Sequence, residues 1–150
     1  MGTRSAIGYK TSEGKICAKY SHYDGYVTGA GKTLHEHYQE ARKIVQMVEL
    51  GDQSYMDKEI FPKGKRHSFE TPEEGVTVFY DRDRGESNVD AQEFDTVQEF
   101  VDYYANSGCE YFYLHTASGW IVHDRYGVGK DASGYPVFDY VENLLLDTNY

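Results

Sequence analysis

The sequence predicts a single α+β domain over residues 1–150, with a mainly antiparallel sheet and two or three helices packed on it. Two pairs of strand-like segments, within 3–23 and 111–123, are each joined by a short turn typical of a hairpin. Segments with helical spacing of apolar residues lie between these hairpins. A length of 150 residues with 15% aromatic side chains suits one folded domain and leaves too little chain for two cores.

The first half is expected to form a hairpin followed by a helix. Residues 3–10 and 15–23 are the predicted strands, joined by the turn Thr11-Ser-Glu-Gly14. A glycine-rich loop over 24–31 follows. One continuous helix is then predicted to run until Gly51, because apolar side chains recur at helical spacing. These side chains are Leu34, Tyr38, Ala41, Val45 and Val48.

The second half has the same kinds of element in a less regular order. Residues 51–74 are expected to be irregular, and residues 76–80 form a short strand. A capping box, Thr96-Val-Gln-Glu99, starts an amphipathic helix that ends at Gly108. The remaining predicted elements are a hairpin over 111–115 and 120–123 and a last short helix that includes Phe138, Val141 and Leu145.

The acidic charge is concentrated in one stretch. Residues 70–110 carry twelve acidic side chains against Arg82 and Arg84, a local charge of −10 that equals the net charge of the whole chain. Such a field favours a partner with a basic surface over direct binding to nucleic acid, although it can also serve only solubility. The predicted acidic face consists of Glu73, Glu74, Asp90, Glu93, Asp95, Glu99 and Asp102.

Other features of the composition predict a protein of the cytoplasm with no membrane contact. No apolar run approaches the ~20 residues that span a bilayer, and the first residues lack the apolar core of a signal peptide. Cys17 and Cys109 show no framework spacing, which fits reduced thiols.

The segment Gly29-Ala-Gly-Lys-Thr33 resembles a phosphate-binding loop only in part. Tyr26 occupies the position at which such a loop needs its first glycine, so the spacing argues against a nucleoside triphosphatase. A weaker hypothesis remains, because Lys32 and Thr33 lie at a predicted helix start, where an anion is favoured.

The histidines do not predict a metal site, and no cofactor is expected. His35 and His37 are about 200° apart on a helix and point to different sides. His115 and His123 lie on paired strands, a placement more often found on plain surfaces than in metal sites. His22 with Asp24 forms either an acid–base pair or a turn with a packed histidine.

The densest charged cluster is Asp81-Arg-Asp-Arg-Gly-Glu86, directly after a predicted strand. Strand alternation would place Arg82 and Arg84 on one face, where they could hold a phosphate or carboxylate. We also expect the loop 22–26 to pack against this cluster, and at least one of the two arginines to be structural, with Asp24 as its candidate partner.

Several blocks of the sequence form a distinctive set: Thr3-Arg-Ser5, His22-Tyr-Asp-Gly-Tyr26, Gly31-Lys-Thr-Leu-His-Glu-His-Tyr38, Leu50-Gly-Asp52, His67-Ser-Phe69 and Gly75-Val-Thr-Val-Phe-Tyr-Asp-Arg-Asp-Arg-Gly-Glu86. Together they resemble an uncharacterised family of small bacteriophage and prophage accessory proteins. Tyr23 replaces a Trp of that pattern, and no Pro follows Tyr26. The resemblance implies a phage accessory protein in the host cytoplasm and implies no particular reaction.

Three functions are compatible with these features. The first is a non-enzymatic protein that binds and inhibits a host protein of defence or nucleic-acid handling, by imitating nucleic-acid charge; its oligomeric state is open. The second is a protein that sequesters a phosphorylated small molecule or nucleotide signal. The third is a small hydrolase that uses His22 or His67 with Asp24 or Asp83. The predicted binding residues are His22, Asp24, Tyr26, Lys32, Thr33, Arg82, Asp83, Arg84 and Glu86.

Overall fold

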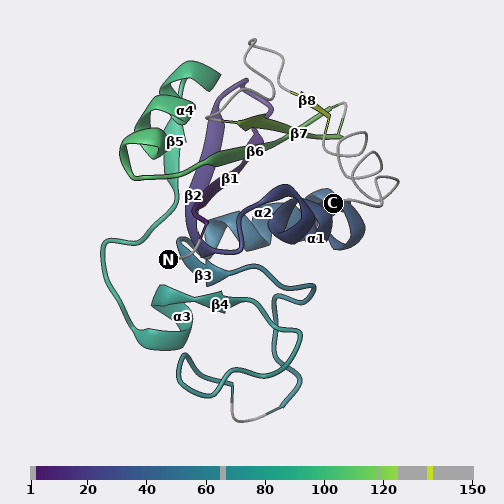
Figure 1. Cartoon of the computed structure of the whole chain (residues 1–150), viewed down its shortest axis with the longest axis vertical. Helices are drawn as coiled ribbons and strands as arrows, with labels where there is room; N and C mark the ends of the chain where they lie inside the picture. Colours follow the sequence, from purple (N-terminus) through teal and green to yellow (C-terminus); the bar gives the residue numbers. More distant parts are fainter. Residues whose placement is uncertain (1–2, 65–66, 118, 125–134, 137–150) are drawn as a thin grey trace.

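The computed structural model describes residues 3–64, 67–117, 119–124 and 135–136. It confirms the predicted α+β class: one mixed sheet carries helices on both faces (Figure 1). The elements are β1 (Ser5–Lys10), β2 (Ile16–Tyr23), the π-helical turn η1 (Val27–Gly31), α1 (Lys32–His37), α2 (Ala41–Glu49), β3 (Gln53–Tyr55), β4 (Val78–Phe79), α3 (Tyr80–Arg84), β5 (Gln92–Phe94), α4 (Val97–Asn106), β6 (Tyr111–Thr116), β7 (Gly119–Asp124) and β8 (Tyr135–Pro136).

The strands lie in the order β4-β3-β2-β1-β6-β7-β8. Both predicted hairpins, β1–β2 and β6–β7, are present, and β1 pairs in parallel with β6. The other edge of β2 is shared, since β5 pairs antiparallel with residues 16–18 while β3 pairs in parallel at Ser21 and Tyr23. Between the two partners the amide of Tyr20 donates to Asp52 Oδ1 at 2.9 Å. A gap in strand pairing thus lies in the middle of β2.

The two faces of the sheet bury separate clusters of apolar side chains. On one face, Ile7, Tyr113 and Val122 pack with residues of η1, α1 and α2. On the other, Ala18 and Phe112 pack with residues of α4. Figure 1 shows α4 and the pair α1–α2 on opposite sides of β1 and β2.

The predicted continuous helix after the glycine-rich loop is wrong, because it is interrupted at residues 38–40. Tyr38 leaves helical geometry, with φ −127° and ψ 66°. Its carbonyl accepts the indole N–H of Trp120 at 2.7 Å, and its hydroxyl donates to the Asp57 carbonyl at 2.6 Å. Tertiary hydrogen bonds of one buried tyrosine therefore outweigh its helical propensity.

The predicted strand over 76–80 is shorter than expected, and the cluster after it is helical. β4 covers two residues, and α3 follows at once and ends at Gly85, whose φ is 75°. Three short strands, β3, β5 and β8, were not predicted. The helix cap at Thr96 was predicted: Thr96 Oγ1 accepts the Glu99 amide at 3.1 Å. The Glu99 carboxylate, however, accepts the amide of Asp95 and not that of Thr96. The last predicted helix lies outside the described residues.

The glycines of the loop 24–31 permit close packing of backbone. A Cβ on Gly25 would lie 2.6 Å from Ser5 Cβ, and the Gly25 amide donates to the Thr3 carbonyl at 2.8 Å. A Cβ on Gly29 would collide with the carbonyl oxygen of Asp24. Both positions thus need glycine to hold the loop against itself and against β1.

Lys19 is fully buried beneath α2. At the end of α2 the Leu50 amide donates to the Gln46 carbonyl and the Gly51 amide to the Val48 carbonyl. The Met47 carbonyl between them accepts Lys19 Nζ at 2.5 Å. The same Nζ lies 4.4 Å from the centre of the Phe79 ring. Burial lowers the pKa of Lys19 well below its ordinary value; nearby Asp52 opposes this shift.

Replacing Lys19 by Met should reveal this lowered pKa. In the unfolded chain the amine titrates near ~10.4, so the folded state binds fewer protons below that pH. The wild type should therefore gain stability relative to Lys19→Met as the pH rises from 7 towards 10, and lose it as the pH falls. Urea unfolding of both proteins across this range measures the difference. A difference that stays constant with pH would show that the amine keeps its ordinary pKa.

Candidate functional site

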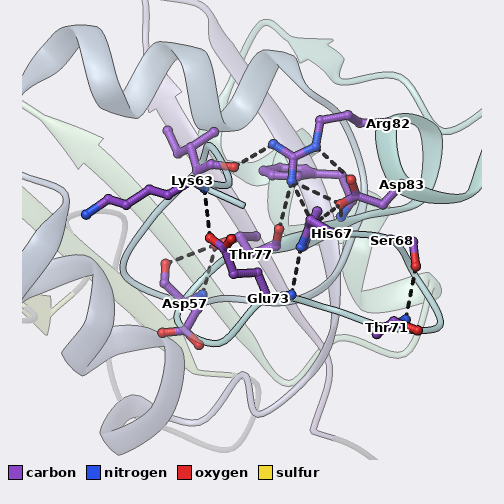
Figure 2. A network of polar contacts seen from close by, with 11 residues as sticks. Asp57, Lys63, His67, Ser68, Thr71, Glu73, Thr77, Arg82 and Asp83 are labelled. Atoms are coloured by element: carbon purple, nitrogen blue, oxygen red, sulfur yellow. Dashed lines mark hydrogen bonds and ion pairs between the residues drawn. The ribbon is translucent and has the colours of Figure 1, made fainter. Parts of the chain in front are cut away.

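The charged cluster of α3 is built around Arg82, which binds groups of the protein itself (Figure 2). Its Nε donates to Asp83 Oδ1 at 2.8 Å and its Nη2 to Asp83 Oδ2 at 3.0 Å. Nη2 also reaches the Thr77 carbonyl at 3.0 Å, and Nη1 donates to the Ile60 carbonyl. The guanidinium further lies 4.7 Å from the centre of the Phe79 ring. Arg82 thus ties α3 to two distant points of the irregular segment between β3 and β4.

Asp83 also holds His67, a residue of that irregular segment. His67 Nδ1 accepts the Glu73 amide at 3.0 Å, so the ring proton is on Nε2, which donates to Asp83 Oδ2 at 3.1 Å. The Phe79 amide donates to the same oxygen at 2.8 Å. Burial acts to raise the pKa of Asp83, but hydrogen bonds from Arg82, the Phe79 amide and His67 outweigh it and lower that pKa.

The arrangement of His67 and Asp83 does not favour the hydrolase hypothesis. Their side chains are 3% and 4% exposed, and both ring nitrogens of His67 are engaged by protein groups. A general base needs a nitrogen that faces the substrate. His67, Asp83 and Arg82 therefore form a saturated polar network, which we call the α3 network, with a structural role.

Arg84 does not join this network. A two-residue step on a helix turns about 200°, so the expectation that Arg82 and Arg84 share one face is wrong. Arg84 Nε pairs with Glu86 at 3.3 Å, and its guanidinium lies 4.6 Å from the centre of the Phe69 ring. It borders an open hollow of about 390 Å³ that Glu70 and Asp83 also line. These carboxylates make the hollow a poor site for a phosphate.

The predicted site residues before α1 mostly serve the local fold. His22 Nδ1 lies 2.7 Å from the Tyr20 hydroxyl, and burial, with Arg4 adding to it, lowers the pKa of His22. The Asp24 carbonyl accepts the Ala30 amide, and the Tyr26 carbonyl accepts that of Gly29. These contacts hold the loop in its turn.

Lys32 and Thr33 do not form the predicted anion site. Because η1 runs directly into α1, the Lys32 amide already donates to the carbonyls of Val27 and Gly29. Thr33 Oγ1 donates to the Gly29 carbonyl at 3.1 Å. The helix start expected at these residues lies inside a helical segment, so its amides are not available to an anion.

The two groups of predicted binding residues stay apart. In the part of the chain that the structure describes, Arg82 binds Asp83 and Arg84 binds Glu86, and neither reaches Asp24. β3 and β4 lie between β2, which leads into the loop 22–26, and α3. No hydrogen bond or ion pair of the described residues joins the loop 22–26 to the cluster 81–86, so the expected packing of the two is not confirmed.

The histidines occupy separate places. His115 pairs in register with Trp120, whereas His123 pairs with Phe112, so alternation sends the two histidines to opposite faces of the sheet. Burial lowers the pKa of His115 beside the Trp120 ring. Across residues 3–64, 67–117, 119–124 and 135–136, no three His, Cys, Asp or Glu side chains are grouped as a metal site requires.

The predicted acidic face is divided into two. Glu73 lies in the irregular segment, where its carboxylate accepts the amide of Lys63 (Figure 2) and that of Gly64. The other part surrounds β5 and α4, far from that segment in Figure 1. We call it the α4–β5 surface; it comprises Asp90, Gln92, Glu93, Asp95, Glu99, Asp102 and Tyr103.

Beside this surface is a small cavity that sequence analysis did not predict. It measures about 110 Å³ and opens where β2 lacks a strand partner. Burial raises the pKa of its Asp52 to about 6. The only hint in the sequence was Leu50-Gly-Asp52, one block of the family resemblance. The cavity is lined by Tyr20, Asp52, Asn88, Asp90, Gln92, Tyr103, Tyr104 and Ser107.

No protein-family model, curated protein or solved structure matches this chain. The resemblance to phage accessory proteins therefore stays a prediction. No helix in the described part of the chain is long and apolar enough to cross a membrane.

The α3 network predicts unequal effects for the two arginines. Arg82→Ala leaves buried Asp83 without its cation and two carbonyls without a donor, and should lower the free energy of unfolding by about 2–4 kcal/mol. Arg84→Ala, the matched control, removes an exposed pair and should change it by about 0.5 kcal/mol or less. Thermal and urea unfolding measure both. Equal effects would contradict the assignment of a structural role to Arg82 alone.

Proposed function

We propose that this protein is a non-enzymatic phage accessory protein that binds and inhibits a host protein through the α4–β5 surface. The observation that carries the proposal is an exposed aromatic side chain, Tyr103, set among exposed carboxylates. Tyr103 is 49% exposed and packs on Phe94, with ring centroids 5.3 Å apart. An acidic surface kept only for solubility has no need of such a ring.

The geometry of α4 supports a directed surface. Glu99, Asp102 and Tyr103 are three and four residues apart and therefore share one side of the helix. Glu93 and Asp95 extend the negative charge on β5 and beyond it, with side chains 61% and 74% exposed. Lys15 is paired with both, at 3.4 and 3.8 Å.

These features fit a partner with a basic surface. Carboxylates steer a cationic partner and select against anionic ones, while a rigid aromatic ring supplies contact area. A cluster of carboxylates can occupy a groove that otherwise binds phosphates, so a host protein that handles nucleic acid, in defence or otherwise, suits the surface. The phage origin and the host cytoplasm rest on the sequence resemblance.

Charge reversal on this surface should abolish binding. The tagged protein is incubated with host lysate at low salt, and the retained proteins are compared for wild type and Glu93→Lys/Asp102→Lys. Glu36→Lys/Glu40→Lys makes the same charge change at two exposed side chains of α1 and the segment that follows it. We expect a basic partner to be retained by wild type and control and lost by the first variant.

Salt should weaken the same complex, because the screening length falls from ~10 Å at 0.1 M to ~3 Å at 1 M. Equal loss of the partner in Glu93→Lys/Asp102→Lys and in its control variant would show that net charge alone matters. Absence of any basic partner at low salt would contradict the proposal.

A further inference from the structure

We propose that the cavity between α4 and the open edge of β2 receives the guanidinium group of an arginine side chain. This inference rests on the proposed function, since the arginine would come from the basic surface of the partner. The cavity borders the α4–β5 surface through Asp90, Gln92 and Tyr103. A volume of about 110 Å³ suits a small planar group and excludes a nucleotide.

The cavity is lined for a cation that donates hydrogen bonds. Asp52 accepts the Tyr20 amide with Oδ1 at 2.9 Å, and its Oδ2 remains an acceptor. Asp90 places a second carboxylate in the lining, and among the described residues no lysine or arginine lines the cavity. Two carboxylates alone are too few for a metal ion, which agrees with the lack of a metal-ligand group in the described residues. A guanidinium has five N–H donors and suits such a set of acceptors.

The second observation is the hydroxyl of Tyr104. Tyr104 is 2% exposed and lines the cavity, and its hydroxyl has no hydrogen-bond partner among the described residues. A buried hydroxyl without a partner destabilises the folded state. Phenylalanine would keep the ring contacts with Phe94 and Phe100 without that penalty. A hydrogen-bond donor that enters the cavity would pair with this hydroxyl and remove the penalty.

The charge around Tyr104 is consistent with a cationic occupant. Burial, with Asp52 as the next cause, raises the pKa of Tyr104, so the phenol lies within the field of that carboxylate. Arg4 of the protein itself makes a long contact of 3.5 Å with the Ser107 carbonyl and does not line the cavity. Tyr103 provides a ring against which an entering guanidinium can stack.

The test uses blocked amino acids as probes, titrated into the full-length protein and followed by NMR. N-acetyl-arginine methylamide should shift the resonances of Asp52 and Tyr104 in a saturable way. The lysine counterpart should bind several-fold more weakly, and the citrulline counterpart, which is neutral and of similar shape, should not bind. Equal shifts with citrulline would overturn the proposal.

Variants separate a binding role of Tyr104 from a structural one. Tyr104→Phe should weaken arginine binding about fivefold or more while its melting temperature stays equal to or above that of the wild type. Asp52→Asn should weaken binding about tenfold or more. Glu36→Gln, outside the cavity, should bind as the wild type does. Unchanged arginine binding in Tyr104→Phe would overturn the proposal, whatever the melting temperature of that variant.

The outcome also distinguishes this inference from the proposed function. If Glu93→Lys/Asp102→Lys loses the partner but the arginine probe does not bind the wild type, the surface is an interface and the cavity proposal is wrong. If the probe binds but partner capture is indifferent to the charge reversal, the cavity is a guanidinium site and the α4–β5 surface is not the interface.

Discussion

The position of the Arg82 guanidinium constrains much of the lower part of the molecule in Figure 1. The segment between β3 and β4 contains little regular structure, so its conformation depends on side-chain contacts. Arg82 fixes it at the carbonyls of Ile60 and Thr77, and Asp83 fixes it again at His67. A partly buried charged pair is stable only when its donors and acceptors are satisfied, and the hydrogen bonds of Arg82 and Asp83 meet this condition.

The same contacts extend to the edge of β2. Arg82 and Lys19 both lie on the ring of Phe79, at 4.7 and 4.4 Å, so β4 is held between the α3 network and the buried lysine. The amide of Tyr80, the next residue, donates to the Asp52 carbonyl at 3.1 Å. The Asp52 side chain is thereby placed opposite Tyr20, at the gap between β3 and β5. The geometry of the cavity thus depends indirectly on α3.

Local signals predicted the parts of this fold that local interactions determine. The turn after Lys10, the cap at Thr96 and the hairpin before Trp120 each depend on a few adjacent residues, and all are present. The helix break at Tyr38 could not be predicted in this way, because its partner Trp120 is 82 residues away. The conformation of residues 80–84 likewise depends on His67 and Ile60, whose approach no spacing reveals.

The candidate sites show the same limit. The dense cluster at 81–86 drew attention by its charge, yet Arg82 and Asp83 are occupied within the fold. The local charge count could not separate Glu73, which binds backbone amides, from Glu93, which lies on an exposed strand. Asp52 and Tyr104 are ordinary in the sequence and become neighbours only because two strands share one edge of β2.

The α3 network and the cavity therefore differ in what they can do. In the α3 network the donors and acceptors satisfy one another, so a ligand would have to replace existing hydrogen bonds and would gain little free energy. In the cavity, the Tyr104 hydroxyl and an Asp52 oxygen retain capacity to accept hydrogen bonds, so an entering donor adds bonds without breaking any. The cavity also opens on the side of the molecule that carries the exposed acidic residues of β5 and α4, where a cationic group would first arrive. Unsatisfied polarity and negative charge coincide there, which is why binding is assigned to this place and structural support to the more conspicuous cluster.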